Sequence, residues 1–297
     1  MVRSHSISDK VIDIVIYAVL ALLALLCLYP IWYTLVLSFS DKTAANAGLV
    51  TLWPRGFNLT SYQVILEDKK FFTSFWISIE RVVIGGLVNF VLTVMMAYPL
   101  SKETSAFRTR NLYMWYLVFC MLFTAGLIPL YMTVTSLNLD NTIWSLILPT
   151  AVPVFNVILI MNFFRSLPKE LEEAAVIDGA GPWKTLIRVF IPLATPALAT
   201  VTLFSIVTHW NSFFDGLIFM SKPENYPLQT YIQQLVVRID PDMMNGMTAE
   251  DMIRMMQTSD KTLNAAKLII AMMPILLLYP FLQKYFVHGI VMGSVKG

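Results

Sequence analysis

Long runs without a charged side chain are the feature that most constrains this sequence. No Asp, Glu, Lys or Arg occurs from Ile14 to Ser40, from Val82 to Ser101 or from Asn111 to Leu139. About 20 apolar residues allow a helix to cross a bilayer, and a helix satisfies its own backbone hydrogen bonds there. The sequence therefore predicts an all-α, polytopic membrane protein with one transmembrane domain over 1–297.

The composition supports this class. Hydrophobic residues make up 57% of the chain and charged residues only 13%, whereas soluble domains carry about 25% charged residues. Six spans are expected from the apolar runs, at about 12–39, 72–100, 112–134, 142–164, 194–219 and 263–286. Three longer polar segments lie between them, at 41–70, 165–193 and 221–262.

Lysines and arginines are distributed unequally over the two sets of loops. The short loops that share a side with both termini carry more of them than the longer loops of the other set. Such an excess marks the cytoplasmic side of a membrane. We therefore expect both termini and the segment 165–193 to be cytoplasmic, and 221–262 to be extracytoplasmic.

The polar segment before the fifth span has an internal design. Four residues recur at helical spacing and define one face: Leu171, Ala174, Ala175 and Asp178. The other, water-facing side is expected to hold Lys169, Glu170, Glu172 and Glu173. Gly179 suits the left-handed conformation that follows a helix end, and Pro182 suits the first turn of the next helix. The segment predicts a helix, a tight turn and a second helix at a membrane surface.

This segment resembles the EAA loop of ABC importer permeases. The matching residues are Glu173-Ala174-Ala175, Asp178-Gly179-Ala180, Ile187 and Ile191-Pro192-Leu193. In that family the loop is the coupling helix, which sits in a cleft of the ATP-hydrolysing subunit. The resemblance implies these ATPase-coupling residues: Glu172, Glu173, Ala174, Ala175, Asp178, Gly179, Ala180, Gly181 and Pro192. The alternative is an ordinary amphipathic connector.

Further matches cover most of the chain. They are Ala97-Tyr98-Pro99-Leu100-Ser101, Trp210-Asn211, Tyr226-Pro227-Leu228-Gln229-Thr230 and the ending from Leu282 to Gly297. These stretches are similar to the carbohydrate-uptake branch, in particular the maltose-type second permease and its relatives for oligosaccharides and polysaccharides. The resemblance implies the ABC importer type I permease fold in a bacterial cytoplasmic (inner) membrane.

The same resemblance implies a set of partners. They are a second, non-identical permease, two ATP-binding cassette subunits, an extracytoplasmic solute-binding protein and a carbohydrate substrate, besides membrane lipid. By this analogy 221–262 docks the binding protein, and the ending from Val287 to Gly297 is a second contact with the ATPases. No cofactor is expected in this chain, since ATP and Mg belong to the ATPase subunits.

Motifs for bond-breaking chemistry are absent from the sequence. The dipeptide Gly-Lys does not occur, which excludes a phosphate-binding P-loop. Neither HExxH nor GxSxG is present, and Cys27 and Cys120 are not spaced as metal ligands. A net charge of +2 gives no indication of nucleic acid. We therefore expect no enzyme, no metal site and no nucleic-acid partner.

Polar and aromatic residues within the spans are candidates for a substrate path, because such groups are costly in a bilayer unless they face water or other helices. The candidates are Glu80, Arg81, Asn156, Trp210, Asn211, Phe214 and Asp215. Rings stack on sugars, and Arg81 is able to bind a carboxylate bidentately. Alternatively, Asn and Trp connect helices, and Glu80 and Arg81 lie at the outer interface or brace a neighbouring helix. Lys267 is expected to extend outward to the interface.

These features predict a permease subunit of an ATP-driven importer that forms, with a second permease, the path for an oligo- or polysaccharide. A self-contained secondary sugar transporter is the alternative. It would need carboxylates deep in the spans and often shows inverted repeats. Only Glu80 and Asp215 are available, and no repeat is visible. A membrane enzyme or scaffold is disfavoured by the missing catalytic motifs.

Overall fold

The computed structural model describes residues 7–237 and 260–294, with side chains at 10–234, 261–278 and 280. Every regular element in these ranges is a helix, which confirms the all-α class. The chain divides into two compact units. One comprises Met1–Lys69 with Leu235–Met273, and the other comprises Lys70–Gln234 with Pro274–Gly297.

Three continuous helices are long and apolar enough to cross a membrane. They are α1 (Ile7–Ser38), α4 (Lys69–Ser101) and α16 (Asp260–Ser294). Three bent pairs also pass this test: α5 (Arg110–Leu122) with α6 (Leu127–Ser136), Ile143–Thr150 with α8 (Val154–Ser166), and Pro182–Leu193 with α12 (Thr195–Asn211). Counting each pair as one span gives six candidate spans in the described chain.

The structure breaks the spans expected at 112–134 and 142–164. The first bends by 112° between α5 and α6, where Phe123 is extended and Gly126 adopts φ +88°. The second bends by 48° between α7–η1 (Ile143–Thr150) and α8, next to Pro149 and Pro153. Proline and left-handed glycine interrupt helical hydrogen bonding without lowering hydropathy, so the apolar pattern does not reveal either break.

The expected fifth span, 194–219, is also divided. Helix α12 ends at Asn211, Ser212 is extended, and the short helix α13 (Phe214–Phe219) follows. On the other side of α12, the segment Pro182–Leu193 lies at 84° to it. Pro196 therefore stands in the first turn of α12, where it fits, and does not kink the interior of the helix.

In the unit that holds the N-terminal helix, α1 is followed by α2 (Lys42–Asn46) and α3 (Thr60–Glu67). The Asp41 carboxylate caps α2 by accepting from Thr43 N at 3.0 Å. Hydrogen bonds from Thr43 lower the pKa of Asp41. Lys267 of α16 is only 4% exposed and donates to Asp68 Oδ2 at 3.2 Å. The expectation that Lys267 extends outward is therefore wrong, because a carboxylate pairs with it within the same unit.

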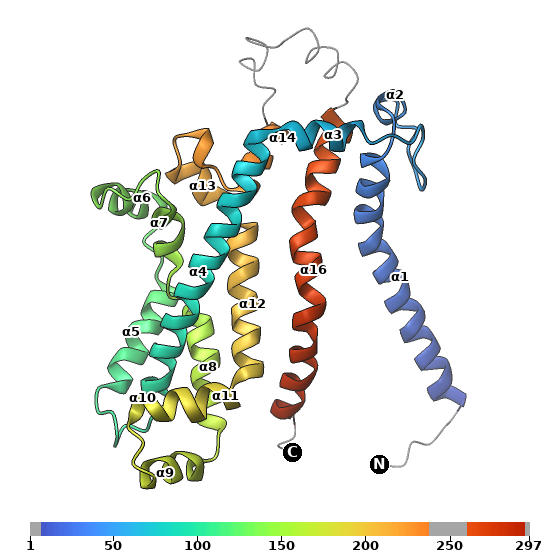
Figure 1. The fold of residues 1–297 in the computed structure, drawn as a ribbon. Helices are drawn as coiled ribbons and strands as arrows, with labels where there is room; N and C mark the ends of the chain where they lie inside the picture. Colours follow the sequence, from blue (N-terminus) through green and yellow to red (C-terminus); the bar gives the residue numbers. More distant parts are fainter. Residues whose placement is uncertain (1–6, 238–259, 295–297) are drawn as a thin grey trace. The chain divides into compact units, whose positions relative to one another are not determined.

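The core of the other unit lies between α4, α5, α8, η2 (Leu186–Phe190) and α12. Its buried residues include Ala97, Val157, Ile160, Ala194 and Val201. Helices α4 and α12 run side by side (Figure 1) and approach closely, since a Cβ on Gly85 would lie 2.6 Å from His209 Nε2. Helices α9 (Lys169–Ile177) and α10 (Pro182–Thr185) lie at the end of this unit where α4 finishes.

At the opposite end of α4, η3 (Pro223–Asn225) and α14 (Leu228–Val237) follow α13. Leu228 N donates to Ser78 Oγ of α4 at 2.8 Å. A Cβ on Gly216 of α13 would lie 2.1 Å from Thr230 Oγ1 of α14. This close packing holds 214–234 against α4. Residues 238–259 of the expected extracytoplasmic segment lie outside the described residues.

Candidate functional site

The helix–turn–helix predicted before α12 is present. Helix α9 ends with Gly179 in the left-handed region, at φ +73°. Gly179 N donates to Val176 O at 3.0 Å, and Ala180 N donates to Ala175 O at 2.9 Å. This pair of bonds is the Schellman arrangement, and it satisfies carbonyls that a helix end leaves open. A Cβ on Gly179 would meet nothing within 4 Å, so backbone conformation alone requires the glycine.

The chain re-enters a helix at Pro182, as predicted. Gly181 is extended, and its carbonyl accepts from Thr185 N at 3.0 Å. The wider π-helical turns of η2 follow, and α11 (Ile191–Leu193), which contains Pro192, completes the segment. Within η2, Phe190 is only 5% exposed and packs into the core, while Ile187 is 59% exposed. This segment therefore has one buried side and one open side.

Helix α9 has no buried residue and presents apolar side chains outward. Leu171 is 41% exposed, Val176 61% and Ile177 85%. Glu172, predicted on the water-facing side, is partly covered: its side chain is 36% exposed and turned toward Lys102. Its carboxylate lies 2.6 Å from Lys102 Nζ, because the chain after α4 supplies a cation there. Large apolar side chains exposed on several sides of an otherwise polar helix are a feature that a partner protein could cover.

Lys102 follows α4 directly and lies in a cluster of aromatic rings. Its ammonium is 4.1 Å from the centroid of Tyr98 and 4.3 Å from that of Phe190. The rings of Tyr98 and Phe190 are 5.1 Å apart, and Phe164 of α8 lies 5.3 Å from Phe190. Lys102 therefore joins α9 to the point where α4, α8 and η2 meet.

A second ion pair links the same two segments at the surface. Lys169 Nζ pairs with a carboxylate oxygen of Glu103, and both side chains are largely exposed. The hydrogen bond to Lys169 lowers the pKa of Glu103, and the reciprocal bond raises the pKa of Lys169. Lys102 and Glu103 thus pair with Glu172 and Lys169 of α9, respectively.

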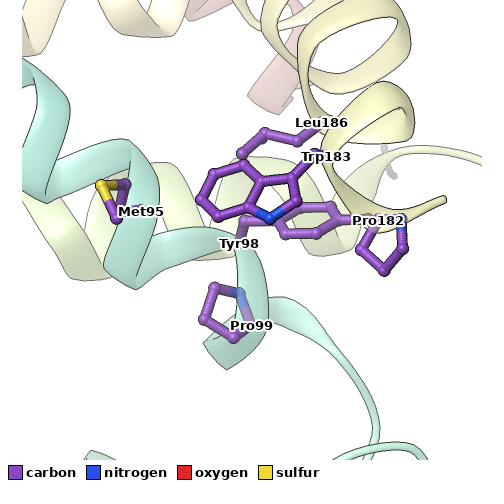
Figure 2. Close-up of a pocket in the computed structure, with 6 residues that line it drawn as sticks. All are labelled: Met95, Tyr98, Pro99, Pro182, Trp183 and Leu186. Carbon is purple, nitrogen blue, oxygen red and sulfur yellow. The ribbon is translucent and has the colours of Figure 1, made fainter.

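Two hollows flank this region. An apolar pocket of about 340 Å³ lies between the end of α4 and α10. Its lining residues, drawn in Figure 2, are Met95, Tyr98, Pro99, Pro182, Trp183 and Leu186. Trp183, which is 63% exposed, covers it from the α10 side. A more polar hollow of about 790 Å³ lies between the α4–α5 loop and α9, with Lys102, Arg165 and Glu172 among its lining residues.

The substrate-path candidates do not form one site. Arg81 is 1% exposed, which excludes the outer interface and agrees with the alternative that it braces a neighbouring helix. Its Nη1 lies 3.2 Å from Asp215 Oδ1, and its Nη2 contacts Asp215 Oδ2 and donates to Leu146 O at 3.4 Å. Ser212 Oγ and Gly216 N also donate to Asp215 Oδ1, at 2.8 and 2.9 Å. Arg81 thus connects α4 to α7 and to the break between α12 and α13.

The other candidates separate into internal and exposed residues. Asn156 Nδ2 donates to Val201 O and Ser205 Oγ, both at 3.3 Å, which ties α8 to α12. Trp210 is buried against Phe75, with ring centroids 5.7 Å apart. These two contacts agree with the alternative of helix–helix connection. Glu80, Asn211 and Phe214 are exposed and remain available for a ligand or partner.

Sequence reasoning missed Asn89 and Lys102. Asn89 Oδ1 lies 3.0 Å from His209 Nε2, and Asn89 Nδ2 donates to Thr150 O at 3.1 Å. Asn89 is the one amide in the uncharged run of α4, which was an available signal. Lys102 gave no signal, because a lysine after a span is ordinary. Within the described ranges, no group of three or more His, Cys, Asp or Glu could hold a metal ion.

Comparison with known proteins gives consistent results. A family model described as "Binding-protein-dependent transport system inner membrane component" matches residues 2–292. A polygalacturonan/rhamnogalacturonan transport system permease protein, YtcP of Bacillus subtilis (strain 168), is 35% identical over 97% of this chain and 99% of its own length. Protein LplC of the same organism is 36% identical over 98% of this chain and 96% of its own length.

A solved structure is also similar. It belongs to a bacterial ABC transporter involved in the import of the acidic polysaccharide alginate. The matched chain is 33% identical, with a TM-score of 0.87, and the match covers 96% of this chain and 100% of that chain. A second chain, from the alginate transporter in complex with a pentasaccharide-bound periplasmic protein, is 17% identical with a TM-score of 0.56 and shows the fold alone.

Proposed function

Since this chain belongs to the family of binding-protein-dependent transport system inner membrane components, we propose that it forms, with a second and non-identical permease, the membrane path for an oligo- or polysaccharide. The chain is a permease subunit of an ABC importer. The observation that carries the substrate proposal is the full-length likeness to a permease of an alginate importer, at 33% identity. The name of YtcP, which includes two other polysaccharides, supports the same class.

The exposed apolar side chains of α9 support a coupling role for the EAA-like segment. Leu171, Val176 and Ile177 are apolar, open and carried on a rigidly capped helix. Such a helix suits a cleft on another protein, where burying about 100 Å² of apolar surface would contribute roughly 2.5 kcal/mol. We propose that an ATP-binding cassette subunit supplies this cleft and that Gly179 keeps α9 correctly presented. ATP and Mg then belong to that separate subunit.

The proposed function fixes an orientation in the bacterial cytoplasmic membrane. Segment 165–193 and both termini face the cytoplasm, and 221–262 faces outward toward a solute-binding protein. Of that outer segment, 238–259 lies outside the described residues, as do the side chains of the C-terminal ending from Val287. The proposal for these parts is supported by the distribution of lysine and arginine.

Recognition of a charged sugar would have to use groups other than the buried cations. Among the described residues, the buried cationic side chains are Arg81 and Lys267, and each pairs with a carboxylate. We propose that the exposed residues Glu80, Asn211 and Phe214, or the partner permease, meet the sugar. Of the two carboxylates that a secondary transporter could use, Asp215 is paired with Arg81 and Glu80 is exposed, which disfavours that alternative.

Reconstitution tests the substrate proposal. The complex of both permeases, the ATPases and the binding protein is placed in liposomes, and ATP hydrolysis is measured with galacturonan, alginate and neutral oligosaccharides. Stimulation by at least one saccharide, and none by amino acids or peptides, is expected. Stimulation by a non-saccharide alone, or sugar uptake by this chain without an ATPase, would contradict it.

Crosslinking tests the coupling role. A cysteine at Ile177, in a background with Cys27→Ser and Cys120→Ser, is expected to crosslink to the ATPase subunit. The matched control is a cysteine at Trp53, which is 72% exposed and lies between the first two spans, outside the cytoplasm in the proposed orientation. It is expected to react with an impermeant maleimide in intact cells and not to crosslink to the ATPase. The reverse pattern would place α9 outside the cytoplasm.

A further inference from the structure

We propose that Lys102 is a positioning residue that couples α9 to α4, so that a displacement of α9 moves α4 as well as α12. This inference rests on the proposed coupling role of α9. Along the chain, α9 connects only to α8 and, through α10 and α11, to α12. Lys102, just after α4, lies 70 positions before Glu172 along the chain. Motion of α9 therefore reaches α4 directly only through non-covalent contacts.

On the α4 side, the backbone of Lys102 is held by a hydrogen bond to the last turn of the helix. Lys102 is the first residue after α4, and its backbone N–H donates to Pro99 O at 3.2 Å, which continues the last turn. Its ammonium then reaches Glu172 Oε1 at 2.6 Å, 70 positions away in the sequence. The ion pair therefore joins the last turn of α4 to the first turn of α9.

The aromatic rings make this contact directional. Lys102 Nζ lies over Tyr98 of α4 at 4.1 Å and over Phe190 of η2 at 4.3 Å. A cation held against ring faces gains energy that depends on its position, and the rings exclude part of the surrounding water. Lateral movement of Glu172 would draw the ammonium off the rings, so the rings oppose independent motion of α9.

The neighbouring ion pair provides an internal comparison. Side-chain exposure is 17% for Lys102 and 36% for Glu172, against 74% for Lys169 and 65% for Glu103. Exposed ion pairs are screened by water and salt and contribute little. The two pairs join the same two segments, so they differ in burial and ring contact and not in topology. We therefore assign the coupling to Lys102–Glu172 alone.

The test substitution removes the positive charge of Lys102 and keeps an unbranched side chain of similar length. In the reconstituted complex, Lys102→Met is expected to lower the ratio of substrate-stimulated to basal ATP hydrolysis by about fivefold, near the lower end of typical coupling factors. Basal hydrolysis and assembly by size-exclusion chromatography are expected to stay unchanged. Lys102→Arg is expected to restore the ratio, and Lys169→Met is the matched control, with no change. A normal ratio in Lys102→Met, or an equal loss in Lys169→Met, would overturn the proposal.

A second readout does not depend on any sugar. A spin label at Glu170 of α9, in the cysteine-free background, is expected to become more mobile in Lys102→Met and not in Lys169→Met. Unchanged label mobility in Lys102→Met would refute the proposed Lys102–Glu172 coupling whether or not a substrate has been found. The two proposals can fail separately. If no saccharide stimulates the wild-type complex but Lys102→Met still raises label mobility, the substrate class is refuted and the Lys102–Glu172 coupling is supported.

Discussion

Arg81 and Asp215 are 134 positions apart in the chain, and the guanidinium of one lies against the carboxylate of the other. Arg81 is 1% exposed and Asp215 20% exposed at the side chain. The pair fastens α4 to the segment where α12 ends and α13 begins. Because Asp215 also accepts from Ser212 and Gly216, the break after α12 is held in one conformation.

Asp215→Asn is expected to destabilise the subunit. It leaves the Arg81 guanidinium buried without a countercharge, and breaking such a pair costs about 3 kcal/mol. Thermal unfolding of the purified complex, followed by tryptophan fluorescence, measures the loss as a lower midpoint. The double variant Arg81→Met with Asp215→Leu is expected to recover much of the stability, since neither charge remains buried. A double variant as unstable as the single one would show that the ion pair is not the cause.

Gly85→Ala is expected to disturb the packing of α4 on α12. Its Cβ would lie 2.6 Å from His209 Nε2, so His209 has to move away from Asn89. Overpacking of this kind costs about 1–3 kcal/mol. Gly86→Ala is the matched control, because its Cβ would lie 3.9 Å from Ile206 Cγ1, which is ordinary contact. Equal unfolding midpoints for the two variants would contradict the close approach of α4 and α12.

Gly179→Asp is expected to abolish substrate-stimulated ATP hydrolysis while the complex still assembles in part. The position has φ +73° and open space around it, so a side chain adds at most about 1–2 kcal/mol of backbone strain, and aspartate also adds a negative charge next to Asp178. Gly179→Asn is the comparison, because asparagine tolerates the left-handed conformation better than most residues. It is expected to keep more stimulation than Gly179→Ala. Normal stimulated hydrolysis in Gly179→Asp would count against the coupling role.

The surface pair Glu103–Lys169 is expected to be insensitive to pH near neutrality. The folded pKa of Glu103 is lowered from 4.5, so its contribution is present above that value and is lost as pH falls through the lowered pKa. The folded pKa of Lys169 is raised from 10.5, so its contribution is present below that value and is lost at higher pH. Spin-label mobility at Glu170 is expected to be constant from pH 6 to about 9.

Acidification below the range of Glu103 is expected to loosen the surface link in the wild type. Glu103→Gln removes the titrating group and is the control, with no additional acid response. If Glu103→Gln also changed label mobility at neutral pH as strongly as Lys102→Met, the two ion pairs would be equivalent. That outcome would remove the basis for distinguishing them.

Local chemistry explains what the sequence predicted well. Interactions within a few residues along the chain determine three features: the turn at Gly179, the helix start at Pro182 and the apolar runs. The breaks near Gly126 and Pro153 were missed because the residues around them stay apolar. The pairing of Arg81 with Asp215 and of Lys267 with Asp68 could not be read from spacing, since tertiary packing brings these residues together. Unmatched charges in apolar runs were the signal that such partners exist.

The position of Glu172 on α9 could not be read from the sequence for a related reason. Helical periodicity tells which residues share a side, and it does not tell which side meets the protein. Glu172 looks like a solvent-facing acid until Lys102, on a different segment, is placed beside it. The aromatic residues Tyr98 and Phe190 that surround this lysine are 92 positions apart and give no joint pattern in the sequence.

The length of α12 has a consequence for the surrounding lipid. Its 17 residues, from Thr195 to Asn211, rise about 26 Å at 1.5 Å per residue, less than the roughly 30 Å of a typical hydrocarbon core. Because the chain bends by 84° before α12 and turns aside at Ser212 after it, neither end is able to extend the crossing. A hydrophobic helix shorter than the hydrocarbon core is accommodated by local thinning of the bilayer, by flanking side chains that reach the interface, or by neighbouring subunits. Acyl-chain length should therefore influence the turnover of the reconstituted complex.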